Sequence, residues 1–142
     1  MADQTLSPLT VADEQRLSEQ RAVVTRYLDD DGLKKYEAAA GKLGTLRALL
    51  AANVFRSDQA YELQSMGIVL GDVFVQDMGF HWVIVEDEYG RDPAIRYAET
   101  SVILYPLTMI SKRVEAGEKV DVFDLYNGVA AHAGELIDRE GQ

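Results

Sequence analysis

Apolar residues recur at helical spacing over most of this chain. A charged segment with a partial apolar stripe begins near Ala12. From Leu33 to Phe55 apolar residues return every three or four positions, which predicts helix. Gly41 and Gly44 interrupt that pattern, and each glycine costs about 1 kcal/mol relative to alanine inside a helix. We therefore expect two shorter helices here rather than one long rod.

A further helix is predicted between an N-cap at Ser57-Asp58 and about Met78. The cap would accept hydrogen bonds from free N–H groups of the first turn. Gly67 and Gly71 share the apolar face of this helix and would let another backbone approach closely. We expect them to serve packing against the sheet or a neighbouring helix. Gly79 suits the left-handed residue that ends a helix.

Strand-forming residues dominate the centre of the chain. Phe80 to Glu86 is rich in aromatic and β-branched residues and is apolar on both faces, which predicts a central strand. Asp87 to Pro93 has the composition of a turn. Ala94–Ala98 and Ser101–Tyr105 predict two more short strands. Their short connections favour antiparallel pairing, because parallel pairing needs a long crossover.

Two helices are expected after the strands. Pro106 suits the first turn of a helix that Gly117 would end. Asp121 is the expected N-cap of the last helix. Its predicted buried stripe comprises Leu125, Val129, His132 and Leu136.

The predicted fold is therefore α+β: N-terminal helices, a three-stranded antiparallel β-meander and two C-terminal helices. Helices should cover at least one face of the sheet. We expect a single domain over residues 1–142, with a flexible tail at 1–10 and a distinctive core at 57–138.

Charge and composition narrow the classes of function. The chain has 24 acidic against 14 basic residues, a net charge of −10, and no cysteine. Repulsion from phosphates makes nucleic acid an unsuitable partner. No window approaches the roughly 18 apolar residues of a membrane span, and the first residues do not resemble a signal peptide. We expect a cytoplasmic protein that uses no disulfide or thiolate site.

The candidate site is the acidic turn with its neighbouring arginines. It does not match a calcium loop, because Tyr89 and Arg91 occupy positions where oxygen ligands are needed. Carboxylates at a hairpin end stay solvated, so we expect either a plain turn or a recognition loop. Cross-strand pairing could hold Arg96 against Glu86. The candidate binding residues are Glu86, Asp87, Glu88, Tyr89, Arg91, Asp92 and Arg96.

No catalytic or metal-binding signature accompanies this turn. His81 and His132 are the only histidines, and no clear third ligand accompanies them for zinc. The serines lie outside any nucleophile-elbow motif, and the glycines form neither a dinucleotide fingerprint nor a phosphate loop. We therefore assign no catalytic residue, no metal and no cofactor.

Two longer motifs resemble a known family. They are G-x-x-W-x-x-x-E-D-E-Y-G-R-D, from Gly79 to Asp92, and Y-P-x-x-x-I-x-K-R, from Tyr105 to Arg113. Between about Leu63 and Val129 the chain resembles a bacterial family of small proteins described only as a domain of unknown function. The resemblance implies a bacterial, soluble, cytoplasmic α+β domain, and it brings no activity, cofactor or catalytic residue.

Two hypotheses for function follow. The first is a non-catalytic protein-binding domain, with a basic protein or a second copy of the chain as its partner. Immunity proteins that block basic toxins are one example by analogy. The alternative is a small-ligand binder or hydrolase that uses Asp87, Asp92, Arg91, Arg96 and His81. That alternative requires these groups to converge in a concave pocket.

Overall fold

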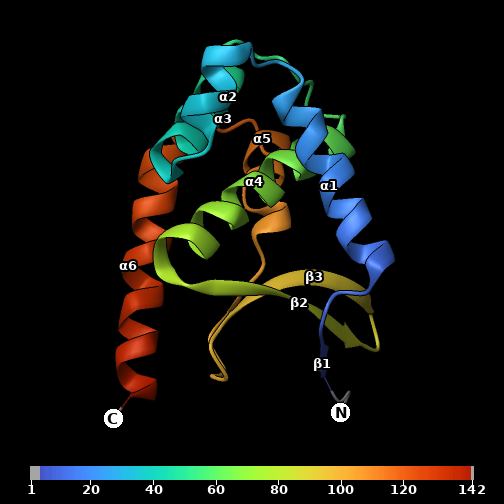
Figure 1. The fold of residues 1–142 in the computed structure, drawn as a ribbon, viewed down its shortest axis with the longest axis vertical. Helices are drawn as coiled ribbons and strands as arrows, with labels where there is room; N and C mark the ends of the chain where they lie inside the picture. Colours follow the sequence, from blue (N-terminus) through green and yellow to red (C-terminus); the bar gives the residue numbers. More distant parts are fainter. Residues whose placement is uncertain (1–3, 142) are drawn as a thin grey trace.

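The chain stacks most of its helices over one face of a single antiparallel sheet, and its last helix runs down beside the sheet (Figure 1). The computed structural model describes residues 4–141. The α+β prediction is confirmed, with a fourth strand in the sheet. In chain order the elements are β1 (Thr5–Ser7), α1 (Val11–Thr25), α2 (Asp30–Tyr36), α3 (Ala39–Ala51), α4 (Ala60–Met78), β2 (Phe80–Asp87), β3 (Gly90–Tyr97), β4 (Ile103–Leu104), the 3₁₀ helix η1 (Pro106–Thr108), α5 (Ser111–Glu115) and α6 (Val122–Glu140).

The added strand lies in the segment expected to be a flexible tail. Thr5–Ser7 pairs antiparallel with β2, so the sheet order is β1-β2-β3-β4. The prediction of a tail is therefore wrong for these residues, while residues 1–3 lie outside the described part. Three residues before Pro8 are too few to show a period of two. Their place is set by backbone pairing with the edge of β2, which thereby becomes the central strand that its composition predicted.

The two faces of the sheet differ in what covers them. Phe80 and Trp82 lie on the side of the helices, where they join the main core around α4. On the outer side, the buried residues of a second, smaller cluster are Val83, Val85 and Ala94. Leu6 and Ile103 pack against that cluster, so neighbouring strands shield it. Both faces of β2 thus carry buried apolar residues, but helices cover only one of the two faces.

The β2–β3 turn is shorter than its composition indicated. Only Glu88 and Tyr89 separate the two strands, and β3 already begins at Gly90. The Asp87 carboxylate accepts a hydrogen bond from the Tyr89 backbone N–H at 2.8 Å. Gly90 has a φ of 144°, which few other residues adopt. Gly90–Pro93 therefore belongs to the hairpin stem, and the predicted turn of Asp87–Pro93 is too long.

Two helices do replace the single long pattern of residues 33–55, but neither glycine separates them. α2 ends at Tyr36 and α3 begins at Ala39. Gly41 lies inside α3, where a Cβ would stand only 1.6 Å from the carbonyl oxygen of Lys35. The missing side chain lets the end of α2 approach α3. Gly41 therefore serves a close contact rather than a helix end.

α4 begins two residues later than its expected cap. The N-cap is Gln59, without a capping side-chain bond, so the prediction of a cap at Ser57-Asp58 is wrong. The Gln59 side chain instead accepts from the Arg56 N–H at 2.7 Å and closes the preceding turn. The local cap rule failed because this turn supplies its own hydrogen bonds. At the other end, the left-handed Gly79, with φ 80°, ends the helix as predicted.

The paired glycines of α4 serve close packing. A Cβ on Gly67 would lie 2.5 Å from the carbonyl oxygens of Pro106 and Leu107. A Cβ on Gly71 would lie 2.6 Å from the Trp82 indole. The predicted close approach is therefore confirmed, and it seats η1 and β2 directly against the α4 backbone.

The last helix packs Leu125, Val129 and Leu136 of its predicted stripe against the main core, and the prediction is wrong for His132. Val122, Tyr126 and Ala133 are its buried residues, whereas His132 is exposed and Leu136 is only partly buried. The Tyr126 hydroxyl donates to Asp77 on α4 at 2.5 Å, which selects the face that turns inward. Across residues 4–141, no helix combines the length and the apolarity that a membrane crossing demands.

Candidate functional site

The predicted site residues lie mostly at the exposed end of the β2–β3 hairpin, the right-hand end of the sheet in Figure 1. We call Glu86–Asp92 the hairpin tip. The Tyr89 side chain is 87% exposed, the highest value among the large hydrophobic residues. Glu86, Glu88 and Asp92 are exposed as well, and Asp87 is partly buried. The tip therefore presents an aromatic ring among solvated carboxylates.

Arg91 is anchored rather than free. Its two Nη atoms donate to the two carboxylate oxygens of Asp13 on α1, each at 2.6 Å. Asp13 is 3% exposed and also accepts from the Thr10 N–H and hydroxyl at 2.8 and 2.9 Å. The Arg91 hydrogen bonds, followed by that of the Thr10 backbone, hold the pKa of Asp13 well below its usual range. The pair clamps the hairpin to the start of α1.

Asp13 was not predicted as the partner of Arg91, although its role in starting α1 could be predicted from neighbouring residues. Thr10-Val-Ala-Asp13 is a capping box, in which the two end residues bond each other's backbone N–H. That pattern predicts where α1 begins. It gives no indication that the same carboxylate also binds a residue in the hairpin.

Arg96 lies on the opposite face of the sheet from Arg91. The register pairs Arg96 with His81 and Glu86 with Arg91, so the expected Arg96–Glu86 contact is wrong. The two-residue turn fixes this register, and side chains five positions apart in a strand face opposite ways. The Arg96 Nε donates to the Thr100 carbonyl at 2.7 Å. Arg96 therefore organises the β3–β4 connection.

The predicted residues consequently do not converge. Arg91 and Asp92 help to line a cavity of about 220 Å³ beside α1, while Glu86–Tyr89 lie outside its lining. His81 is exposed on the outer face of the sheet, and His132 is exposed on α6. Within residues 4–141, no cluster of three or more acidic or histidine side chains could hold a metal ion.

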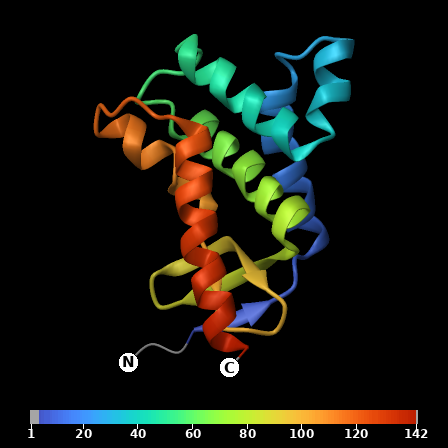
Figure 2. The same ribbon diagram turned by 90° about the vertical axis from the view of Figure 1, so that its left-hand side faces the viewer.

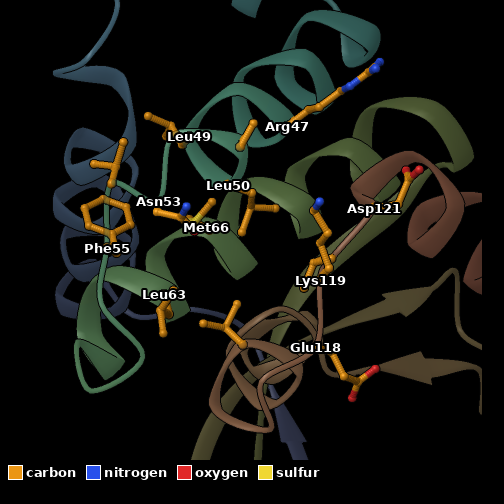
Figure 3. Close-up of a pocket in the computed structure, with 14 residues that line it drawn as sticks. Arg47, Leu49, Leu50, Asn53, Phe55, Leu63, Met66, Glu118, Lys119 and Asp121 are labelled. Carbon is orange, nitrogen blue, oxygen red and sulfur yellow. The ribbon is translucent and has the colours of Figure 1, made fainter.

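A larger cavity of about 410 Å³ lies at the other end of the molecule (Figure 3). Its walls come from residues between Arg47 and Phe55, from Leu63 and Met66 of α4, and from residues between Val114 and Asp121. Figure 2 shows the end of α3 and the α5–α6 connection at the same end of the molecule. Because three separate segments build the walls, no single motif in the sequence could have indicated this cavity.

Two left-handed residues shape the walls of the larger cavity. Asn53, with φ 51°, follows the end of α3, where the Val54 N–H donates back to the Leu49 carbonyl at 3.2 Å. Gly117, with φ 79°, ends α5 in the same way. The backbone turns sharply at both residues, which brings the segments after α3 and α5 against α4. Asp121 then caps α6 by accepting from the Asp124 N–H at 3.1 Å.

A partly buried polar cluster joins α1, α4 and β2. The Arg21 Nε and Nη2 donate to the Asp72 carboxylate at 2.7 and 2.8 Å, and the Trp82 Nε1 donates to it at 3.0 Å. Burial, followed by the charge of Asp72, raises the pKa of Tyr36 to about 12. The Tyr36 hydroxyl is buried and has no hydrogen-bond partner within residues 4–141. The cluster connects three elements and opens onto neither cavity.

The fold and its surfaces define a small α+β domain with an anchored, exposed hairpin and an apolar cavity. The chain belongs to the family described as a domain of unknown function, DUF3806, whose model matches residues 42–126. The predicted family resemblance is thereby confirmed. The matched segment contains the hairpin tip and the whole lining of the larger cavity, whereas Asp13 precedes it.

The fold also occurs in a solved structure. A crystal structure of a protein from Bacteroides thetaiotaomicron VPI-5482 matches 91% of this chain with a TM-score of 0.73 and 15% identity. The match covers 48% of that chain, so this chain spans about half its length. At this identity the likeness shows the fold alone. No curated protein matches the chain significantly.

Proposed function

We propose that this chain is a non-catalytic protein-binding domain whose hairpin tip recognises a basic partner. The observation that carries the proposal is the 87% exposed ring of Tyr89 at the end of an anchored hairpin. Tyrosine is among the residues that most often dominate the energy of protein interfaces. A ring held out in water gains most of its contact area only when a partner covers it.

The anchoring of the hairpin supports this role. Arg91 is bound through both Nη atoms to a buried carboxylate on α1, and β1 pairs with the segment of β2 just before the tip. A surface that is rigid before binding loses little conformational entropy when the complex forms. The tip is thus preorganised, unlike a mobile loop.

The charge of the tip supports a basic partner. No ion pair within residues 4–141 uses Glu86, Glu88 or Asp92, so these carboxylates remain available. Together with the net charge of −10, they would steer a basic protein toward the tip. In this proposal the domain works in the bacterial cytoplasm, and an immunity-type complex with a basic toxin is one form of it. A second copy of the chain is the other partner to test.

A small-ligand or hydrolytic role is the second candidate. The lining of the 220 Å³ cavity favours it, because Arg91 and Asp92 reach that cavity from the hairpin. It is the weaker candidate, since Asp13 already accepts from both Nη atoms of Arg91. Arg96 and His81, which it also needed, belong to the opposite face of the sheet.

Partner capture with tip variants tests the first candidate. Wild-type protein and Tyr89→Ala would be used to capture proteins from a lysate of the native host, followed by affinity measurement on the purified partner. We expect Tyr89→Ala to weaken binding by about thirtyfold, the effect of removing an interface hot spot. Tyr105→Ala, at a 42% exposed tyrosine outside the tip, is the matched control.

Charge variants separate steering from contact. Glu86→Gln with Glu88→Gln should slow association at low salt and leave dissociation nearly unchanged. Capture of no protein that depends on Tyr89, or equal affinity for Tyr89→Ala and wild type, would overturn the proposal. If Tyr89→Ala kept its affinity for the captured protein and a variant of the 220 Å³ cavity such as Gln64→Trp lost it, the partner would bind at that cavity and not at the tip.

A further inference from the structure

The larger cavity carries an inference independent of the hairpin tip. Its volume of about 410 Å³ falls within the range of about 300–1,000 Å³ that is usual for small-molecule sites. Leu63 and Met66, each 1% exposed, form part of its base, and Leu50, Val54 and Phe55 add apolar walls. A cavity of this composition favours an apolar group over a polar one.

The charged residues at the rim differ in where they point. In Figure 3 the Lys119 side chain rises along the edge of the cavity, whereas Arg47 and Glu118 extend outward. Arg47 also lies over the Phe123 ring, with 5.7 Å between its guanidinium carbon and the ring centroid. Asp121 is engaged as the cap of α6. Lys119 is therefore the charged group best placed to meet an occupant.

Lys119 is also available for pairing. It takes part in no ion pair within the described residues. Asn53, another lining residue, lies across the cavity from Lys119, on the far side of Leu50 in Figure 3, so it takes no part in this pairing. An ammonium group next to apolar walls complements a molecule with a hydrocarbon body and a carboxylate head. A cationic head group would instead meet Lys119 with like charge.

We infer that this cavity binds a small apolar carboxylate, with its hydrocarbon part against Leu50, Val54, Phe55 and Met66 and its carboxylate paired with Lys119. The site uses no residue of the hairpin tip. The inference is therefore independent of the proposed protein-binding function, and a test of one does not decide the other.

Three probes with the same chain and different head groups test the inference: octanoate, octanol and octylamine. Titration calorimetry should give the tightest binding for octanoate and the weakest for octylamine. Lys119→Met keeps the length of the side chain and removes its charge. It should weaken octanoate binding by about fivefold, the upper end of the effect expected for an exposed ion pair, and leave octanol binding unchanged. Lys112→Met, at an exposed lysine of α5 outside the cavity, is the control.

Ala51→Phe tests the cavity itself, because Ala51 lines it and a phenyl ring there would take up part of its volume. Binding of octanoate should be lost in this variant and kept in Ala48→Phe, at an exposed alanine one turn earlier on α3. Amide NMR shifts of the wild-type protein give a readout that needs no variant. Octanoate should shift the amides of residues 50–55 and 114–121.

Three outcomes would overturn the inference. They are octanoate binding no tighter than octylamine, equal binding by Ala51→Phe and Ala48→Phe, and shifts absent from both of those segments. Unchanged octanoate affinity in Lys119→Met would likewise remove the assigned role of Lys119 and the preference for a carboxylate.

Discussion

Two carboxylate–guanidinium pairs hold α1 in place, and they differ in what else each carboxylate binds. Both pairs are bidentate, with distances between 2.6 and 2.8 Å. Asp13 finds its other partner locally, in Thr10 three residues before it. Asp72 takes all of its donors from other elements, Arg21 on α1 and Trp82 on β2. The Asp13–Arg91 pair thus extends a helix cap, whereas the Asp72–Arg21 pair belongs to a junction of three elements.

Similar bond geometry therefore does not mean that the two ion pairs contribute equally to stability. Loss of Asp13 would open a helix start and release the hairpin, and Arg91, 36% exposed, could then reach water. Loss of Asp72 would leave Trp82 without an acceptor in a partly buried position. An unsatisfied buried donor costs more than the bond itself contributes. We therefore expect loss of Asp72 to lower the free energy of unfolding more than loss of Asp13 does.

The largest effect should come from Asp72→Ala. We expect a loss of about 2–3 kcal/mol in the free energy of unfolding, which is below the range for fully buried pairs because Arg21 is 35% exposed. Asp72→Asn keeps an acceptor for Trp82 and should lose less. Chemical denaturation of both variants measures the difference. Equal losses would show that the Trp82 bond contributes nothing.

The next effect concerns Asp13→Asn and its dependence on pH. Because the pKa of Asp13 in the folded protein lies well below its unfolded value of about 3.9, its stabilisation is complete above about pH 5. It decreases as the pH falls below 4. The variant should melt below the wild type at pH 7, and the gap should narrow toward pH 3. Thermal unfolding at several pH values would contradict this if the gap stayed constant.

A smaller effect is expected for Thr10→Ala. This change removes the hydroxyl that caps the Asp13 N–H and leaves the Arg91–Asp13 pair in place. The usual cost of losing such a cap is about 1 kcal/mol. If urea unfolding gave a loss as large as that of Asp72→Ala, the hydroxyl would be stabilising the ion pair as well as the helix.

The smallest effect should follow Tyr36→Phe. The Tyr36 hydroxyl is buried near Asp72 and has no hydrogen-bond partner among residues 4–141, so its removal deletes no hydrogen bond of the described structure. We expect a change within about 0.5 kcal/mol, in either direction. A loss clearly above that value would mean that the hydroxyl belongs to the Asp72 junction after all.

Local patterns predicted the elements well and their contacts poorly. Helical spacing, the left-handed Gly79 and the close approach at Gly67 were all indicated by neighbouring residues. β1 was not, because three residues show no period and only the edge of β2 selects them. The Arg91–Asp13 pair and the 410 Å³ cavity join segments far apart in the chain, and no single-sequence pattern reports such distances. The error for Arg96 came from a turn that is shorter than its composition suggested.

The pairing of Thr5–Ser7 with Ile84–Glu86 has a consequence for synthesis of the chain. The ribosome makes β1 about 80 residues before β2, so β1 can pair only after β2 has been synthesised. A fusion tag placed directly before Thr5 would crowd that late step. We expect such a tag to slow refolding more than the same tag at the C-terminus.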